Sequence, residues 1–141
     1  MSHHTICEIQ EGLLQKIDEY RFAQSKELSA MILKIDKENL LIELEDHLTE
    51  TTFEEIADEL PEMSPRYIIL NYEHKKPDGR VSYPFIFVYY SPAGTKMDLH
   101  MLYASCKMDI STKAKITKQF ELTDAEDFTS EWLEKQLEFY K

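Results

Sequence analysis

The sequence predicts a mixed α/β domain, of α/β or α+β type, in which one mixed sheet lies between helices. Helical and strand periodicities alternate along the chain and give the element order α-β-β-α-β-β-α-β-α. One segment, Phe85-Ile-Phe-Val-Tyr-Tyr90, is apolar on both faces, which is typical of a central strand covered by helices on both sides. A length of 141 residues suits one domain, so we expect residues 1–141 to share a single fold.

The first third of the chain is expected to form a helix and two strands. Apolar residues at helical spacing follow the capping-box pattern Thr5-x-x-Glu8 and predict a helix over residues 6–20. Residues 30–36 are largely apolar, and residues 40–45 alternate apolar with acidic side chains. This pattern predicts two consecutive strands, of which the second is half exposed.

The middle of the chain is expected to form a short helix followed by two strong strands. The pattern Thr52-x-x-Glu55 is a second capping box, and the apolar residues after it predict a helix over residues 53–60. Residues 66–74 and 81–90 carry strand patterns on either side of a Pro-Asp-Gly turn signal. We therefore expect these two strands to be joined by a hairpin turn.

The last third of the chain is expected to form a long helix, a strand and a final helix. Thr95 is expected to cap a helix over residues 96–111. Residues 116–122 alternate as a further strand. Thr129 is expected to cap the last helix, whose apolar residues recur at helical spacing.

The long helix has two apolar lines on opposite sides, although a helix of a soluble domain normally has one. At about 100° per residue, one line holds Leu99, Leu102, Cys106 and Ile110, and the other holds Met97, Met101, Ala104 and Met108. We expect the first line to face the core. Methionine is common on surfaces that bind other proteins, so the second line is either a partner-binding face or is covered by the protein's own loops.

The net charge of −11 argues against nucleic acid and against anionic membranes as partners. The charge is uneven, because residues 96–118 contain five lysines and two aspartates and so carry +3, which leaves −14 for the rest. A basic region on an acidic protein suits an acidic protein partner, or it merely solvates a helix end and the next strand. The sequence has no run suited to a membrane span and no signal-peptide pattern, so we expect neither.

The sequence also lacks the motifs of an enzyme or a metal site. Cys7 and Cys106 are far apart and have no metal-like spacing, so we expect a reducing cytosolic setting with Cys106 as a small apolar core residue. There is no glycine-rich phosphate loop, nucleophile elbow or zinc-protease motif. The acidic run that begins at Glu43 lacks the central glycine of a calcium loop and is expected to be a solvated face. We expect no catalytic residue, metal or cofactor; a hydrolase or redox enzyme would rest only on the presence of Cys, His and Asp.

The segment Met101-Leu-Tyr-Ala-Ser-Cys-Lys107 resembles the Met-Ile-Tyr-Ala-Ser-Ser-Lys signature on the long helix of the actin-depolymerising factor/cofilin homology family. The flanking sequence is closer still to one branch of that family, the glia maturation factors. The motifs that carry this resemblance are Ile35-Asp36-Lys37, Asp58-Glu59-Leu60-Pro61, Pro65-Arg66, Asp78-Gly-Arg-Val-Ser-Tyr-Pro84, Ser91-Pro92 and Glu131-Trp-Leu133. They span almost the whole chain, and they imply the cofilin-like fold with a mixed sheet of five or six strands between helices.

Resemblance to the glia maturation factors implies a monomeric, non-enzymatic regulator of the actin cytoskeleton. Members of this branch bind the actin-related protein 2/3 complex, suppress actin nucleation and take branch junctions apart. The implied location is the cytoplasm, at cortical actin, with the nucleus as a further location. The long helix is expected to enter a groove of an actin-like subunit, with Met101 at the family's contact methionine. The implied contact residues are Met97, Met101, Ala104 and Met108, bordered by Lys96, His100 and Lys107.

The alternative is a cofilin-like protein that binds and severs actin filaments directly. Two departures from cofilins argue against it. Cofilins carry lysines where this chain has Asp98 and His100, and a reversed charge at the first position should weaken docking on actin. Cofilins also carry basic residues on the last helix, which here is acidic overall.

The turn between the two middle strands is the candidate second contact, with actin of the daughter filament as its partner. Its candidate residues are Lys75, Lys76, Asp78 and Arg80. The alternative interpretation is a solvated hairpin in which Asp-Gly only makes the turn.

A third candidate contact lies at the N-terminal side of the chain. Arg21 and Lys26 resemble a basic segment of the family. Ser2 is a candidate phosphorylation site, because related proteins are switched at an N-terminal serine. A phosphate there would add roughly two negative charges and should weaken docking on an acidic partner.

Overall fold

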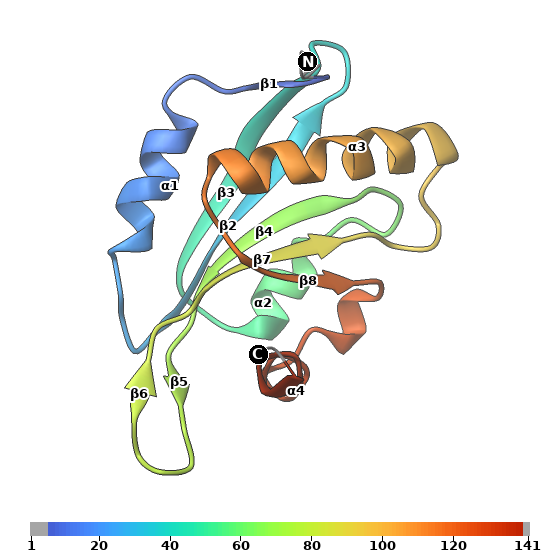
Figure 1. Ribbon diagram of the computed structural model, residues 1–141. Coiled ribbons are helices and arrows are strands. Elements are labelled where there is room, and N and C mark those ends of the chain that lie inside the picture. Colours follow the sequence, from blue (N-terminus) through green and yellow to red (C-terminus); the bar gives the residue numbers. More distant parts are fainter. Residues whose placement is uncertain (1–5, 140–141) are drawn as a thin grey trace.

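The computed structural model describes residues 6–139, which form a six-stranded mixed sheet with helices on both faces (Figure 1). The strands lie in the order β1-β3-β2-β4-β7-β8. Their bounds are Glu8–Ile9 for β1, Leu28–Asp36 for β2, Leu41–Thr51 for β3, Arg66–Asn71 for β4, Phe85–Tyr90 for β7 and Lys118–Leu122 for β8. The pairs β1–β3 and β7–β8 are parallel, and the other neighbours are antiparallel. The predicted fold class is confirmed.

Both faces of the sheet centre are buried. Successive residues of a strand point to opposite faces, so each central strand contributes to two cores. On β4, Tyr67 and Ile69 join one core, whereas Ile68 and Leu70 join the other. The residues of β7 alternate in the same way. This arrangement explains why residues 85–90 are apolar without interruption.

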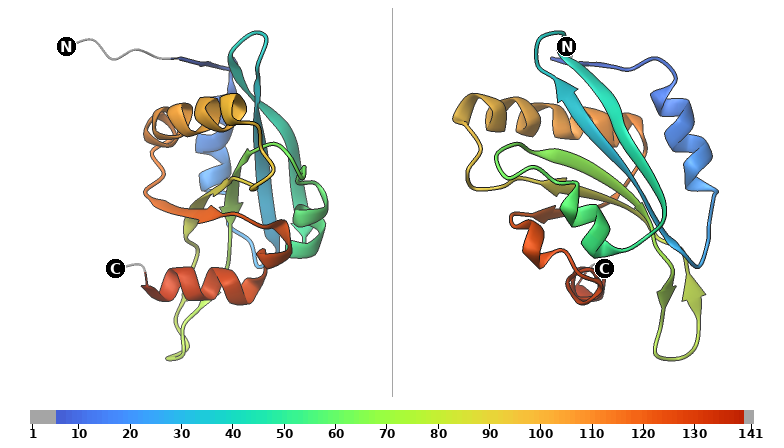
Figure 2. Two further views of the ribbon diagram at one scale, coloured as in Figure 1. Left: turned by 90° about the vertical axis from the view of Figure 1, so that its right-hand side faces the viewer. Right: turned by 180° about the vertical axis from the view of Figure 1, so that it is seen from behind.

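The helices divide between the two faces. Helices α1 (Leu13–Arg21) and α3 (Met97–Lys113) cover one face. Helices α2 (Phe53–Asp58) and α4 (Ser130–Phe139), with the 3-10 helix η1 (Ala125–Asp127), cover the other. In Figure 1 α3 lies in front of the sheet, and the view from behind in Figure 2 places α2 and α4 in front instead.

The first helix begins at Leu13 and not at residue 6 as predicted. Gly12 precedes it with a left-handed φ of 82°, a conformation that glycine adopts without strain. Glu8–Ile9 instead form β1, which pairs in parallel with β3. The prediction was wrong because the free edge of β3 offers backbone partners that a local capping pattern cannot reveal. Thr5 itself lies outside the described residues.

The strands of the middle region also differ from the prediction. The second predicted strand continues to Thr51. The strands predicted over 66–74 and 81–90 are each interrupted, so that β5 (His74–Lys75) and β6 (Val81–Ser82) form a separate hairpin beyond the sheet (Figure 1). Pro84 lies at one interruption. Proline has no amide hydrogen to donate to a neighbouring strand, so the ladder resumes only after it.

Two of the predicted helix caps are confirmed. Thr52 accepts a hydrogen bond from the third residue of α2 at 3.1 Å, and Thr129 accepts one from the third residue of α4 at 3.0 Å. The cap predicted at Thr95 is wrong, because Lys96 occupies that position. The Thr95 hydroxyl donates instead to the carbonyl of Pro92 at 2.8 Å and so stabilises the turn that precedes α3.

Two buried tyrosines attach α3 to the sheet. The Tyr103 hydroxyl accepts a hydrogen bond from the Ile35 amide on β2 at 2.9 Å. The Tyr67 hydroxyl on β4 donates to the Tyr103 carbonyl at 2.5 Å. Both side chains are fully buried, and this desolvation raises the pKa of Tyr67 above its ordinary value. The Tyr67 hydroxyl therefore keeps its proton and remains a donor.

Arg21 holds the C-terminal end of α3. Its guanidinium donates to the carbonyls of Ala114 and Lys115, the latter at 3.2 Å. It also lies 4.7 Å from the centre of the Phe85 ring. A cation at the carbonyl end of a helix offsets the negative end of the helix dipole, so this contact both ends the helix and fixes its position.

Replacing Tyr103 with Phe is expected to lower the free energy of unfolding by about 1–3 kcal/mol, because the Ile35 amide would stay buried without an acceptor. Urea denaturation followed by circular dichroism measures this change. Tyr89→Phe is the matched control, since it removes a buried hydroxyl that accepts no hydrogen bond from a backbone amide of the described residues. We expect the control to be nearly as stable as the wild type; equal losses in both variants would contradict the role assigned to Tyr103.

Candidate functional site

Helix α3 places its predicted core line inward and its methionine line in solvent. On the inner line Cys106 and Ile110 are buried, and the two leucines are partly buried against the same core. The outer line consists of Met97, Met101, Ala104 and Met108, all exposed, and its methionines keep 70%, 59% and 66% of their surface in solvent. No loop within residues 6–139 therefore covers these four residues, which we call the methionine face.

Three basic side chains were predicted to border the methionine face. Lys96 is exposed at the start of α3. His100 is half-buried, with its Nδ1 atom 3.2 Å from the Ser91 hydroxyl oxygen. Lys107 is also half-buried, and its Nζ atom lies 5.4 Å from the centre of the Tyr89 ring. His100 and Lys107 thus form a polar border along the flank of α3 that faces β7.

The opposite flank of the methionine face carries an acidic residue. The Asp98 carboxylate lies 2.9 Å from Lys37 Nζ, and both side chains are more than 60% exposed. The hydrogen bond from Lys37, followed by the one from the Leu99 amide, holds the pKa of Asp98 below its usual range. Asp98 is therefore ionised at neutral pH and adds a charge pair to this border.

The β5–β6 hairpin projects from the end of the molecule opposite α3 (Figure 1). Its turn is closed by a hydrogen bond from the Lys76 amide to the Arg80 carbonyl at 2.8 Å. Asp78 accepts hydrogen bonds from the Arg80 amide at 3.0 Å and from its Nε atom at 2.7 Å, which lowers the pKa of Asp78. Lys75 Nζ lies 3.7 Å from Glu73. Two of the three hairpin cations therefore have a carboxylate close by.

A cavity of about 700 Å³ lies between this hairpin and α4. Its lining includes the hairpin residues His74, Lys76 and Arg80 and the α4 residues Glu134 and Glu138. The ring of His74 lies 3.2 Å from the Glu134 carboxylate. The surface around the hairpin is thus of mixed charge and has concave as well as projecting parts.

The N-terminal candidates do not form one surface in the part of the chain that the structure describes. Arg21 is half-buried and bonded to the end of α3, so its guanidinium has a structural role. Lys26 is exposed between α1 and β2. Ser2 lies outside the described residues.

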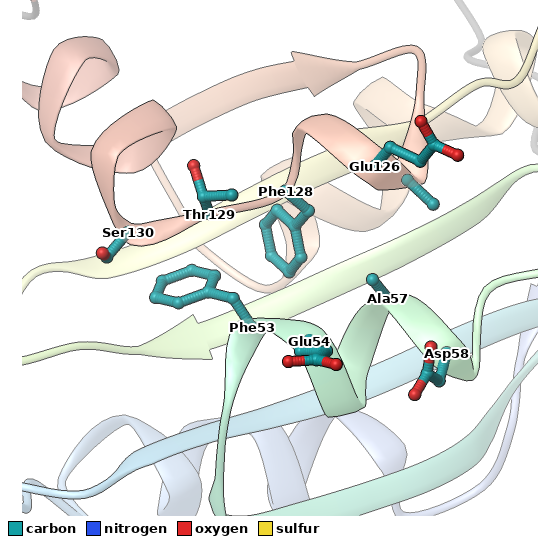
Figure 3. A pocket seen from close by; sticks show the side chains of 9 residues that line it. Phe53, Glu54, Ala57, Asp58, Glu126, Phe128, Thr129 and Ser130 are labelled. Carbon is teal, nitrogen blue, oxygen red and sulfur yellow. The ribbon is translucent and has the colours of Figure 1, made fainter.

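The sequence analysis missed a groove of about 500 Å³ between α2 and the segment of η1 and α4 (Figure 3). Its apolar residues include Phe53 and Phe128, whose rings meet edge to face with centres 5.0 Å apart. Glu54, Asp58 and Glu126 also line it. Of the acidic run predicted to be a solvated face, Glu54 thus borders a concave surface on the side of the sheet opposite α3.

The sequence does contain a signal for this acidic surface, because the two segments that form it lack lysine and arginine. Residues 38–65 and 119–134 supply the groove and contain sixteen acidic residues and no lysine or arginine. With −16 on these segments, the rest of the chain carries +5 of the total of −11. The charge is therefore segregated more strongly than residues 96–118 alone suggested.

The described residues were also compared with the requirements of a metal site and of a membrane span. Within residues 6–139 no three His, Cys, Asp or Glu side chains are grouped so that they could hold a metal ion. No helix in that range is long and apolar enough to cross a bilayer.

Comparison with known proteins agrees with this geometry. The family model for cofilin/tropomyosin-type actin-binding proteins matches residues 6–138. Glia maturation factor beta of Mus musculus is 40% identical over 135 residues, 96% of this chain and 95% of that protein. Glia maturation factor of Drosophila melanogaster is 34% identical over 137 residues, 97% and 99% of the two chains. The solution structure of glia maturation factor from Caenorhabditis elegans matches with a TM-score of 0.80 at 36% identity, covering 96% of this chain and 98% of that one. The chain therefore belongs to the cofilin/tropomyosin-type actin-binding protein family and, within it, to the glia maturation factors.

Proposed function

We propose that this protein is a non-enzymatic regulator of the actin cytoskeleton that binds the actin-related protein 2/3 complex. It acts in the cytoplasm, where it inhibits actin nucleation by the complex and promotes debranching of filaments. The observation that carries the proposal is the methionine face, which is exposed on α3 while the opposite line of the same helix is buried. Membership of the glia maturation factors supports this choice of partner.

The methionine face is suited to helix-in-groove binding. Full burial of a methionine side chain contributes roughly 1.5–3 kcal/mol before the costs of association, and the unbranched thioether adapts to an irregular groove. The hydrogen bonds of Tyr103 and Tyr67 hold α3 in place before it binds. Little backbone order has to be gained on docking, which leaves more of the burial energy for affinity.

The charge distribution supports an acidic, actin-like partner. The two segments that lack basic residues meet at the groove on the α2–α4 side of the sheet, whereas α3 lies on the other side. Glu54, Asp58 and Glu126 line this groove, so an acidic partner is repelled from it and is attracted to the more basic surfaces elsewhere. Lys96 and Lys107 then border the contact.

The proposed mechanism requires a preference between two states of the branch junction. Binding shifts an equilibrium only by the difference in affinity for its two states. Either α3 occupies a groove that the complex needs for the daughter filament, or it favours a conformation that cannot hold the branch. The hairpin lies at the other end of the molecule, so it can contact the daughter filament's actin while α3 contacts the complex.

Two features favour the complex over bare actin filaments as the partner. Asp98, which is paired with Lys37, stands where cofilins carry a lysine, so a cation that cofilins present to the filament is missing here. Helix α4 contains Glu131, Glu134 and Glu138 but a single lysine, and it is therefore poorly suited to an acidic filament. Direct filament binding and severing remains the competing outcome of the binding test.

The double variant Met101→Asp, Lys107→Glu is expected to weaken binding to the purified complex about 30-fold or more, because a charge would be buried at the centre of the contact. Pull-down of the complex measures this loss, and co-sedimentation with bare filaments is run in parallel. Phe139→Asp is the control, since Phe139 is 81% exposed on α4, which covers the face of the sheet opposite α3. Unchanged binding by the double variant would contradict the proposed site, and micromolar binding of the wild type to bare filaments would favour the cofilin-like alternative.

The variant Lys75→Glu, Lys76→Glu is expected to slow debranching about tenfold, while binding to the isolated complex changes by less than about threefold. This variant keeps the Asp78–Arg80 pair that forms the turn. Debranching is measured by fluorescence microscopy of single branched filaments, with the charge reversal Lys16→Glu at an exposed position of α1 as the control. Normal debranching by the hairpin variant would remove the second contact from the mechanism.

A further inference from the structure

The two cysteines of the chain are in contact. The Sγ atoms of Cys7 and Cys106 lie 3.0 Å apart, although 99 positions separate them in the sequence. Both are free thiols, and their residues are only 1% and 2% exposed. Cys7 immediately precedes β1, and Cys106 belongs to the inner line of α3. The separation exceeds a sulfur–sulfur bond by only about 1 Å, so a small shift of either side chain would allow a bond to form.

We propose that Cys7 and Cys106 form a redox modification site, a dithiol that reacts with a small disulfide such as glutathione disulfide to give an intramolecular disulfide. The bond would tie the N-terminal segment to α3. This proposal rests on the contact between the two thiols and is independent of the proposed binding to the actin-related protein 2/3 complex.

The reaction is a two-step thiol–disulfide exchange. The Cys7 thiolate attacks one sulfur of glutathione disulfide, which forms a mixed disulfide and releases one glutathione thiolate. The Cys106 thiolate then attacks the Cys7 sulfur, which forms the protein disulfide and releases the second glutathione. The two cysteines lose two protons and two electrons, and glutathione disulfide leaves as two molecules of the reduced thiol.

The surroundings of the pair make Cys7 the residue that reacts first. Cys106 lies within a long helix that is packed on the sheet, whereas Cys7 is held by β1, a strand of only two residues at the sheet edge. The Glu8 amide donates to the carbonyl of Leu40, just before β3, at 2.9 Å, and the Gln10 amide donates to the carbonyl of Ile42 on β3 at 2.8 Å. These two hydrogen bonds keep β1 in place. Its unpairing would expose Cys7 while the rest of the core stays closed.

The closed state protects the reduced pair. Burial, and then the neighbouring Cys106 thiol, raise the pKa of the Cys7 thiol to about 12, so little reactive thiolate is present while β1 is paired. Formation of the disulfide would in turn prevent β1 from unpairing. The methionine face lies on the opposite line of α3 and is left unchanged.

The test uses the reduced wild-type protein, incubated with glutathione disulfide without oxygen, acid-quenched and analysed by mass spectrometry and peptide mapping. We expect a product that has lost two hydrogen atoms and contains a Cys7–Cys106 cross-link. Its Tm should rise by roughly 10 °C, because a long loop is closed in the unfolded chain. Hydrogen exchange at the Glu8 and Gln10 amides should slow about tenfold or more.

The single variants Cys7→Ser and Cys106→Ser are the matched controls. Neither can form the internal bond, so we expect no rise in Tm for either. In the Cys106→Ser variant, we expect Cys7 to form a mixed disulfide with one glutathione. The reduced wild type and the double serine variant serve to separate the effect of the bond from that of the substitutions. The proposal is overturned if the wild type yields only glutathione adducts, cross-linked dimers or unreacted thiols. It is also overturned if the Glu8 and Gln10 amides of the disulfide form exchange as fast as those of the dithiol form.

Discussion

The burial of one side of α3 against the sheet is the constraint on which the rest of the structure depends. Tyr103 is its centre, because it accepts a hydrogen bond from β2 through its hydroxyl and one from β4 through its carbonyl. These two bonds fix the rotation of the helix as well as its position. Once the inner line is committed to the core, the methionines on the opposite line have to face solvent. The exposed surface is thus a consequence of how the core is built.

Local patterns predicted those parts of the fold whose causes are local. Thr52 and Thr129 cap their helices as expected, and the unbroken apolar run over 85–90 correctly indicated a strand buried on both faces. The start of the first helix was predicted wrongly, because pairing of Glu8–Ile9 with the edge of β3 competes with helix formation. That competition depends on a segment more than thirty residues away, which a capping pattern does not report.

The candidate site shows the same division between local and distant causes. Helical periodicity was sufficient to place four residues on one line, but it could not tell whether a loop covers them. The structural role of Arg21 was missed, since its carbonyl partners lie at the far end of α3 in the sequence. The contact between Cys7 and Cys106 was missed for the same reason. The acidic groove could be inferred only from where lysine and arginine are absent, together with the contact between α2 and η1.

The segregation of charge gives the molecule an electric dipole. In the electric field of an acidic partner, the protein rotates before the two surfaces make contact. The side of the protein remote from the α2–α4 groove then faces the partner. This rotation acts over a Debye length of about 8 Å at physiological ionic strength. Salt should therefore change the frequency of correctly oriented encounters more than the lifetime of the complex. The carboxylates that line the α2–α4 groove take no part in the proposed contact, yet they influence the direction of approach.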